Sequence, residues 1–182
     1  MIKTKQLLIT IFLISSLILL PGCSNNNQDV SINKENTTST STSIPNDLLN
    51  YINNELPKIA QVETIVTDGY NNLIEEEYID NFTIFKILSD SIIPNSRKLI
   101  EEAELIQPST KEVREIHELY INAITQQDSA FTLMLSALEN QDYEVLTKAN
   151  EKLNEGRKAI RDYTYEIESL AKSNNVILEF NE

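Results

Sequence analysis

Residues 142–173, DYEVLTKANEKLNEGRKAIRDYTYEIESLAKS, carry the most regular hydrophobic pattern in the chain. Apolar or small residues recur at alternating intervals of three and four positions, at Leu146, Ala149, Leu153, Gly156, Ile160, Tyr163, Ile167 and Leu170. A heptad stripe of this kind favours neighbouring helices at shallow crossing angles. The stretch therefore predicts a long helix, capped by Asp142, within a helical bundle.

Two earlier stretches predict helices that each contain a proline. The first spans about residues 46–76, with Asn46 as its expected N-cap and a kink or restart at Pro57. Its apolar stripe is Ile52, Ile59, Val66 and Leu73, with Val62 and Gly69 at the intervening positions. The second spans about residues 80–106, bends at Pro94, and has the stripe Phe85, Leu88, Ile92, Leu99 and Ile106. Past the bend, we expect this stripe to rotate onto Ser96 and Ala103.

A third helix is predicted over residues 109–140, because Ser109-Thr110-Lys111-Glu112 has the spacing of a capping box. Its two core rows are Val113, Tyr120, Gln127 and Met134, and Ile116, Ala123, Ala130 and Ala137. Four helices with short connections predict an all-α fold over residues 46–182, as an antiparallel up-down four-helix bundle. An extended three-helix arrangement is the alternative. The apolar residues 176–180 are expected to dock on the end of the bundle.

The first 22 residues have the features of a secretory signal peptide. Lys3 and Lys5 precede an uncharged, largely apolar run of 14 residues that ends at Leu20. This run is short for a membrane span, which needs about 20 apolar residues, but it suits a signal-peptide core.

The end of the run, Leu20-Pro21-Gly22-Cys23, resembles the lipobox of bacterial lipoproteins. The resemblance implies a diacylglycerol thioether on Cys23, cleavage after Gly22, and a lipid anchor on the extracytoplasmic face of the cell membrane. Pro21 departs from the small or aliphatic residue usual at its position. A plain anchor helix with an incidental cysteine is the alternative. The rest of the chain is similar to small helical lipoproteins of Gram-positive bacteria, which implies no particular activity.

Residues 23–45 are predicted to be a flexible linker behind the lipidated cysteine. Ser, Thr and Asn make up 14 of the 22 residues from Ser24 to Pro45, which leaves little apolar surface to offset the cost of ordering. A glycosylated stalk is the less favoured interpretation.

The charge of the chain restricts its partners. Without residues 1–22 the chain has 13 basic and 28 acidic residues, a net charge of −15. Such a surface repels nucleic acid and anionic lipid headgroups, so we expect contact with the membrane only through the lipid on Cys23. The expected partner is another envelope protein or a cationic ligand.

No motif predicts a cofactor, a metal site or a catalytic residue. His117 is the single histidine, which excludes a di-iron bundle with two Glu-x-x-His pairs. It lies next to a core row, near Tyr120, and is expected to be a structural or surface histidine. Acid pairs such as Glu112 and Glu115 are numerous in so acidic a chain and are interpreted as solvated helix faces.

Gly69 and Gly156 are the two glycines after the signal peptide, and both fall on core-facing rows. Glycine in a helix interior costs about 1 kcal/mol relative to alanine. We expect both positions to allow close helix approach or to leave room for a bulky partner such as a tyrosine ring, and a small ligand pocket is the functional alternative.

The sequence therefore favours a lipid-anchored interaction module without enzymatic activity. Two alternatives remain open at this point. One is an envelope enzyme or enzyme accessory that uses Glu residues and His117, and the other is a small-molecule-binding lipoprotein.

Overall fold

The computed structural model describes residues 43–75 and 78–178, and every regular element in these ranges is a helix. The predicted all-α class is therefore confirmed. In chain order the elements are α1 (Ile44–Asn50), η1 (Tyr51–Glu55), α2 (Leu56–Glu75), α3 (Asn81–Ile87), η2 (Leu88–Ile92), α4 (Ile93–Glu104), α5 (Lys111–Asn140) and α6 (Tyr143–Ser173). Here η denotes a π-helical turn, and these elements join into about four long rods: α1–η1–α2, α3–η2–α4, α5 and α6.

A π-helical turn precedes each internal proline of the first two rods. η1 is followed by Pro57 and η2 by Pro94. Proline lacks an N–H, and its ring clashes with the carbonyl group four residues earlier. In a π turn the bonds reach back five residues, as from the Leu56 N–H to the Tyr51 carbonyl. This change of register lets each rod continue past its proline.

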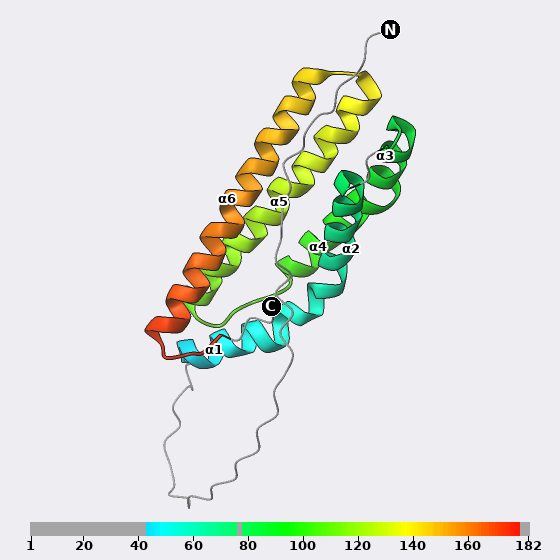
Figure 1. The fold of residues 1–182 in the computed structure, drawn as a ribbon. Coiled ribbons are helices and arrows are strands. Elements are labelled where there is room, and N and C mark those ends of the chain that lie inside the picture. Colours follow the sequence, from blue (N-terminus) through cyan, green and yellow to red (C-terminus); the bar gives the residue numbers. More distant parts are fainter. Residues whose placement is uncertain (1–42, 76–77, 179–182) are drawn as a thin grey trace, which may run out of the picture.

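The rods form two layers, which Figure 1 shows. α5 and α6 lie side by side as one hairpin, and α2 packs on α4, which contacts α5. The first rod is strongly curved: α1 and η1 run across the lower end of the α5–α6 hairpin, and α2 then rises beside α4. The sequence predicts a kink or restart at Pro57 in this rod, and the curvature agrees with a kink.

The core has two parts, and together they contain most residues of the predicted stripes, although Phe85 is in neither part. At the end crossed by α1, the core includes Ile52, Ile59, Leu99, Tyr120 and Tyr163. Toward the other end it includes Val66, Ile92, Phe131, Met134 and Leu153. All eight residues of the two rows predicted for α5 are buried. The helical periodicity of the sequence therefore predicts most of the buried core residues.

Two predicted helix starts are wrong. α1 begins at Ile44 with Ser43 as N-cap, not at Asn46, because Pro45 fits the first turn of a helix. α5 begins at Lys111 with Thr110 as N-cap, and no side chain of a capping box bonds there. By contrast, the predicted cap at Asp142 is confirmed, since its Oδ1 accepts the N–H groups of the first turn of α6.

The segment after α6 returns to the core. Val176 and Leu178 pack against the part of the core at the α1 end, whereas Ile177 is 84% exposed. The predicted docking is confirmed as far as Leu178, and residues 179 and 180 lie outside the described ranges. Leu20, Pro21, Gly22, Cys23 and the linker up to residue 42 also lie outside them.

Candidate functional site

An open groove of about 430 Å³ runs between α5 and α6. It lies along the first turns of α5 and the last turns of α6, near the end that α1 crosses. Residues three and four apart on each helix share one face, which brings two short stretches opposite each other. Its lining residues are Glu112, Glu115, Ile116 and Leu119 from α5, and Glu166, Ser169, Leu170 and Ser173 from α6.

The groove combines apolar and acidic groups. Ile116, Leu119 and Leu170 supply its apolar side chains, and three glutamates and two serines supply its polar ones. No lysine or arginine is among its lining residues. Glu115 pairs with Lys111 on the same helix at 3.3 Å, but both side chains are mostly exposed, so this pair is weak. The groove is therefore suited to cationic groups that also carry apolar surface.

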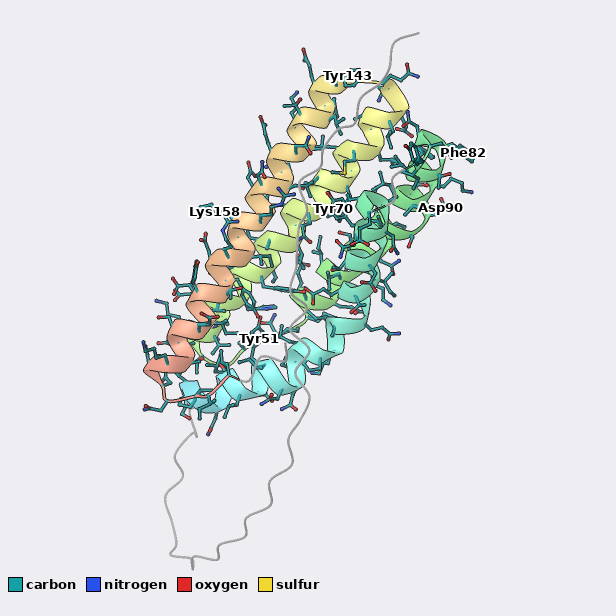
Figure 2. All side chains as sticks on the ribbon, in the orientation of Figure 1. Tyr51, Tyr70, Phe82, Asp90, Tyr143 and Lys158 are labelled. Carbon is teal, nitrogen blue, oxygen red and sulfur yellow. The ribbon has the colours of Figure 1, made fainter. Side chains whose placement is uncertain are left out.

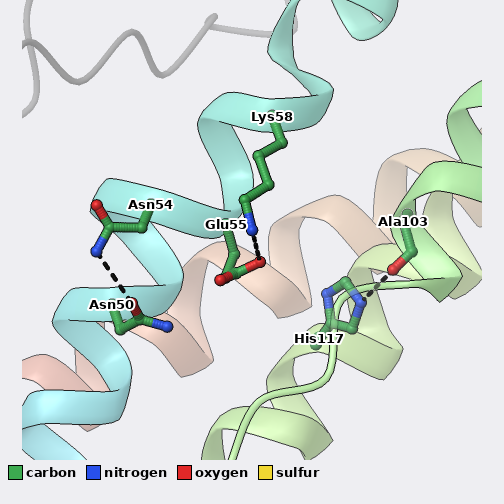
Figure 3. Close-up of polar contacts among 6 residues, drawn as sticks. All are labelled: Asn50, Asn54, Glu55, Lys58, Ala103 and His117. Atoms are coloured by element: carbon green, nitrogen blue, oxygen red, sulfur yellow. Dashed lines mark hydrogen bonds and ion pairs between the residues drawn. The ribbon is translucent and has the colours of Figure 1, made fainter.

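His117 lies in the core instead of in this groove. It is 2% exposed, and its Nε2 donates to the Ala103 carbonyl oxygen at 2.9 Å, as Figure 3 shows. Its Nδ1 lies 3.0 Å from the Tyr51 hydroxyl, which donates to it. Burial lowers the pKa of the imidazole, although the Ala103 carbonyl and the charge of Glu118 act in the opposite direction. The ring thus links η1, the end of α4 and α5 in its neutral form.

Tyr120 lies next to this histidine, and Tyr163 and Glu63 lie next to Tyr120. The Tyr120 ring stacks at 6.3 Å from the imidazole and lies 5.5 Å from the Tyr163 ring. Burial raises the pKa of all three tyrosines, Tyr51, Tyr120 and Tyr163, so they stay protonated at neutral pH. Burial also raises the pKa of the Glu63 carboxyl, and interaction with the Tyr120 hydroxyl offsets part of this rise.

This group of Tyr51, Glu63, His117, Tyr120 and Tyr163 resembles a set of acid–base residues, but all of them except the partly exposed Glu63 are buried. None of the five lines either the groove or the internal cavity described below. General acid–base catalysis needs a substrate within hydrogen-bond reach of the catalytic groups. In the described part of the chain, these side chains pack against and hydrogen-bond to one another.

Asp47 is a polar residue whose role the sequence does not reveal. It is 2% exposed on α1, and its carboxylate accepts the N–H of Ser109 at 3.0 Å and the N–H and hydroxyl of Thr110 at 2.7 Å. Arg114 donates to the carbonyl groups of Pro108 and Ser109 from the other side. Burial would raise the pKa of Asp47, but these hydrogen bonds and the Arg114 charge outweigh it and lower the pKa.

The Asp47 contacts explain why the capping box is absent. A carboxylate that is 62 residues away in sequence takes the N–H groups at the start of α5. No local pattern marks this partner, because capping signals consider only residues within one turn. Asp47 and Arg114 together fix the connection between α4 and α5, which ends beside the groove.

Both glycines face a neighbouring helix at close range. A Cβ at Gly156 would lie 3.3 Å from the Ala123 carbonyl oxygen and from Gln127 Cγ. A Cβ at Gly69 would lie 3.2 Å from Ile92 Cγ1. This is the geometry of close helix approach, and neither glycine lines the cavity or the groove.

One internal cavity of about 20 Å³ lies between α2, α5 and α6. It is lined by Val66, Thr67, Tyr70, Asn71, Gln127, Phe131 and Leu153. Ligand pockets for small molecules are usually some 300–1,000 Å³. This cavity is far too small for such a ligand and has room for about one water molecule.

Two classes of feature are absent from residues 43–75 and 78–178. No helix there is long and apolar enough to cross a membrane. No group of three or more His, Cys, Asp or Glu side chains in those residues could hold a metal ion.

The comparisons with known proteins give no relative. No protein-family model matches the chain, and no curated protein or solved structure is significantly similar to it.

Proposed function

We propose that the protein is a lipid-anchored interaction module that binds a basic, amphipathic segment of another envelope protein in the groove between α5 and α6. In this proposal, Cys23 carries the lipid, residues 24–43 form the flexible linker, and the helices make an antiparallel up-down four-helix bundle outside the membrane. The charged start, apolar run and lipobox-like Leu20-Pro21-Gly22-Cys23 support the anchor. Two acyl chains give a stable anchor where one is marginal.

The groove is the observation that carries the proposal. Its floor offers Ile116, Leu119 and Leu170 to an apolar side chain, and Glu112, Glu115 and Glu166 stand around it. A helix that docks in a groove presents apolar anchors at intervals of three and four residues. Lysines or arginines that flank those anchors would meet the three carboxylates. The occupant we propose is therefore a short basic amphipathic helix.

The two kinds of side chain would contribute differently. Each buried Å² of apolar surface contributes about 25 cal/mol, so contacts with the floor add to the affinity. Exposed ion pairs contribute only about 0.2–1 kcal/mol each. Their larger effect is on the association rate and on the choice of partner, because the whole chain is strongly acidic. Nucleic acid and anionic lipid would be repelled by the same field.

The place of the groove suits a tethered protein. The described chain enters at Ser43, and α1 runs across the same end of the hairpin where the groove lies. A flexible linker of about 20 residues has an average end-to-end distance of roughly 25 Å. The groove would thus stay within a thin layer above the membrane. Because this raises its effective concentration near a membrane-bound partner, a modest affinity is enough for binding.

A peptide titration tests the proposal. The probe is a labelled amphipathic peptide of Leu and Lys at helical spacing, titrated with the full chain and followed by fluorescence anisotropy. We expect binding that weakens with salt and that falls about tenfold when Glu112, Glu115 and Glu166 are all changed to Gln, which corresponds to ~1.4 kcal/mol.

The matched control is the same change at Glu101, Glu139 and Glu151, which are exposed and do not line the groove. Both triple variants alter the net charge equally. If the two sets weaken binding to the same extent, only the overall charge matters and the groove is not the site. A peptide with Glu in place of Lys should not bind either protein.

A further inference from the structure

A buried tyrosine hydroxyl beside the internal cavity points to a second, smaller site. Tyr70 in α2 is 6% exposed, and its hydroxyl makes no hydrogen bond with another described residue. A buried donor without a partner costs about 1–3 kcal/mol, so such groups usually bond to the protein or to ordered water. Tyr70 also lines the cavity, which is therefore the space next to an unsatisfied polar side chain.

The cavity has the size and polarity to hold one water molecule. Its volume of about 20 Å³ exceeds the roughly 10–15 Å³ that a single water needs on this measure. Thr67 and Asn71 from α2 and Gln127 from α5 line it together with Tyr70. These side chains offer both donors and acceptors, and a buried water normally makes two to four hydrogen bonds. A dry cavity would instead be expected to have apolar walls alone.

The surrounding contacts keep Tyr70 in this position. Its ring lies 5.3 Å from that of Phe131, and Figure 2 shows it on the inner side of α2, facing the α5–α6 layer. Burial raises the pKa of Tyr70 to about 12, and the charge of Arg157 on α6 offsets part of this rise. The hydroxyl therefore keeps its proton at neutral pH and is available as both donor and acceptor.

We infer that this cavity binds one ordered water molecule, which satisfies the Tyr70 hydroxyl and bridges α2 to the Gln127 side chain of α5. The site is independent of the groove. Its role is to supply a hydrogen bond across a helix interface where the Tyr70 hydroxyl has no partner among the described residues. The same water would make Gln127, which lies on a core row of α5, acceptable in the interior.

Thermal unfolding of the full chain and its variants tests this inference. Tyr70→Phe removes only the hydroxyl and keeps the ring against Phe131. If a water satisfies the hydroxyl, the variant loses a hydrogen bond and its unfolding midpoint falls. If the hydroxyl is unsatisfied in a dry cavity, the same variant is relieved of a buried polar group and its midpoint rises or stays unchanged, which would overturn the inference.

A double-mutant cycle with Gln127→Met adds a readout specific to a bridge. Two groups that share one water are coupled, so the double variant should lose less than the two single losses added together. Additive losses would contradict a shared water. Tyr143→Phe is the matched control, because the Tyr143 side chain is exposed and its midpoint should not move. Long-lived water contacts to the Tyr70 ring in nuclear magnetic resonance spectra provide the direct observation.

Discussion

The Tyr51 hydroxyl in η1 lies 3.0 Å from Nδ1 of His117 in α5, and the two rings meet edge to face at 5.4 Å. The other ring nitrogen of His117 bonds to the Ala103 carbonyl at the end of α4. One neutral imidazole therefore connects three rods at the end of the molecule that α1 crosses. This connection and the Asp47 carboxylate hold α1 and η1 against the start of α5.

The His117 connection predicts that stability falls with acid in a defined range. The folded-state pKa of His117 is lowered, so the unfolded chain binds the proton first as the pH decreases. Stability should therefore be greatest above the unfolded value of about 6.5 and should decline below it. Urea unfolding between pH 7.5 and pH 5 measures this change.

The control for this prediction is His117→Gln, which keeps a hydrogen-bonding side chain without a titrating group. We expect this variant to lose about 1–3 kcal/mol of folding free energy at pH 7.5. Its stability should then decline much less between pH 7.5 and pH 5 than that of the unchanged protein. Glu63 acts in the opposite direction, since its raised pKa favours the folded state as the pH falls from neutrality. The comparison is therefore also made between Glu63→Gln and the double variant Glu63→Gln, His117→Gln. If stability changes with pH by the same amount in both, His117 is not the source of the decline.

Asp47→Ala should be among the most destabilising single changes in α1. It leaves the N–H groups of Ser109 and Thr110 without their acceptor, at an expected cost of about 3 kcal/mol in chemical denaturation. Because the pKa of Asp47 is lowered, its contribution is present above the model-peptide value near 3.8 and is lost as the pH falls.

Asp142→Ala is the matched control, because Asp142 also accepts two N–H groups at a helix start but is exposed. An exposed N-cap costs about 1 kcal/mol to remove. Equal losses for the two variants would show that the burial of Asp47 adds nothing.

Gly156→Leu should destabilise the fold by about 2–3 kcal/mol. A side chain at this position meets the Ala123 carbonyl, and backbone cannot move aside as a flexible side chain can. Gly69→Ala is the comparison, since its new Cβ meets only the Ile92 side chain and the substitution gains up to about 1 kcal/mol of helix propensity. In calorimetry, the unfolding midpoint of Gly69→Ala should be well above that of Gly156→Leu. The reverse order would contradict the close approach of α5 and α6.

Cys23→Ala should release the protein from the membrane or leave it unprocessed. Lipidation requires the thiol, and no helix in the described residues could replace the anchor. Metabolic labelling with radioactive fatty acid provides the measurement. Label that still enters the Cys23→Ala protein would show that Cys23 is not the attachment site.

The sequence predicts the helices and most of the core well. The alternating stripe of α6 and both rows of α5 are determined by periodicity alone, because each lies on a continuous helix. The stripe of the second rod also rotates as expected, since Ser96 and Ala103 are buried. A proline inside the pattern signalled a disturbance, but its form as a π turn depends on which bonds the preceding residues make.

Contacts between distant residues could not be predicted in the same way. Asp47 meets Ser109 and Thr110 across 62 and 63 residues, and Tyr51 meets His117 across 66. The curvature of the first rod brings them together. Pro57 signals a kink in this rod, but no local pattern encodes which distant residues the kink brings into contact. The groove could not be predicted either. In the sequence, Glu112 and Glu115 are indistinguishable from other acid pairs, and only the fold places Glu166 of α6 with them in one groove.

Site-specific photo-crosslinking in intact cells tests the proposed docking surface most directly. A photoreactive residue replaces Ser169, which is exposed in the groove, or Thr147, which is exposed on the same helix outside it. We predict one discrete protein adduct from Ser169, absent from Thr147 and lost when Glu112, Glu115 and Glu166 are changed to Gln. The same adducts from both positions, or an adduct from Ser169 that survives the glutamate changes, would contradict a partner held in the groove.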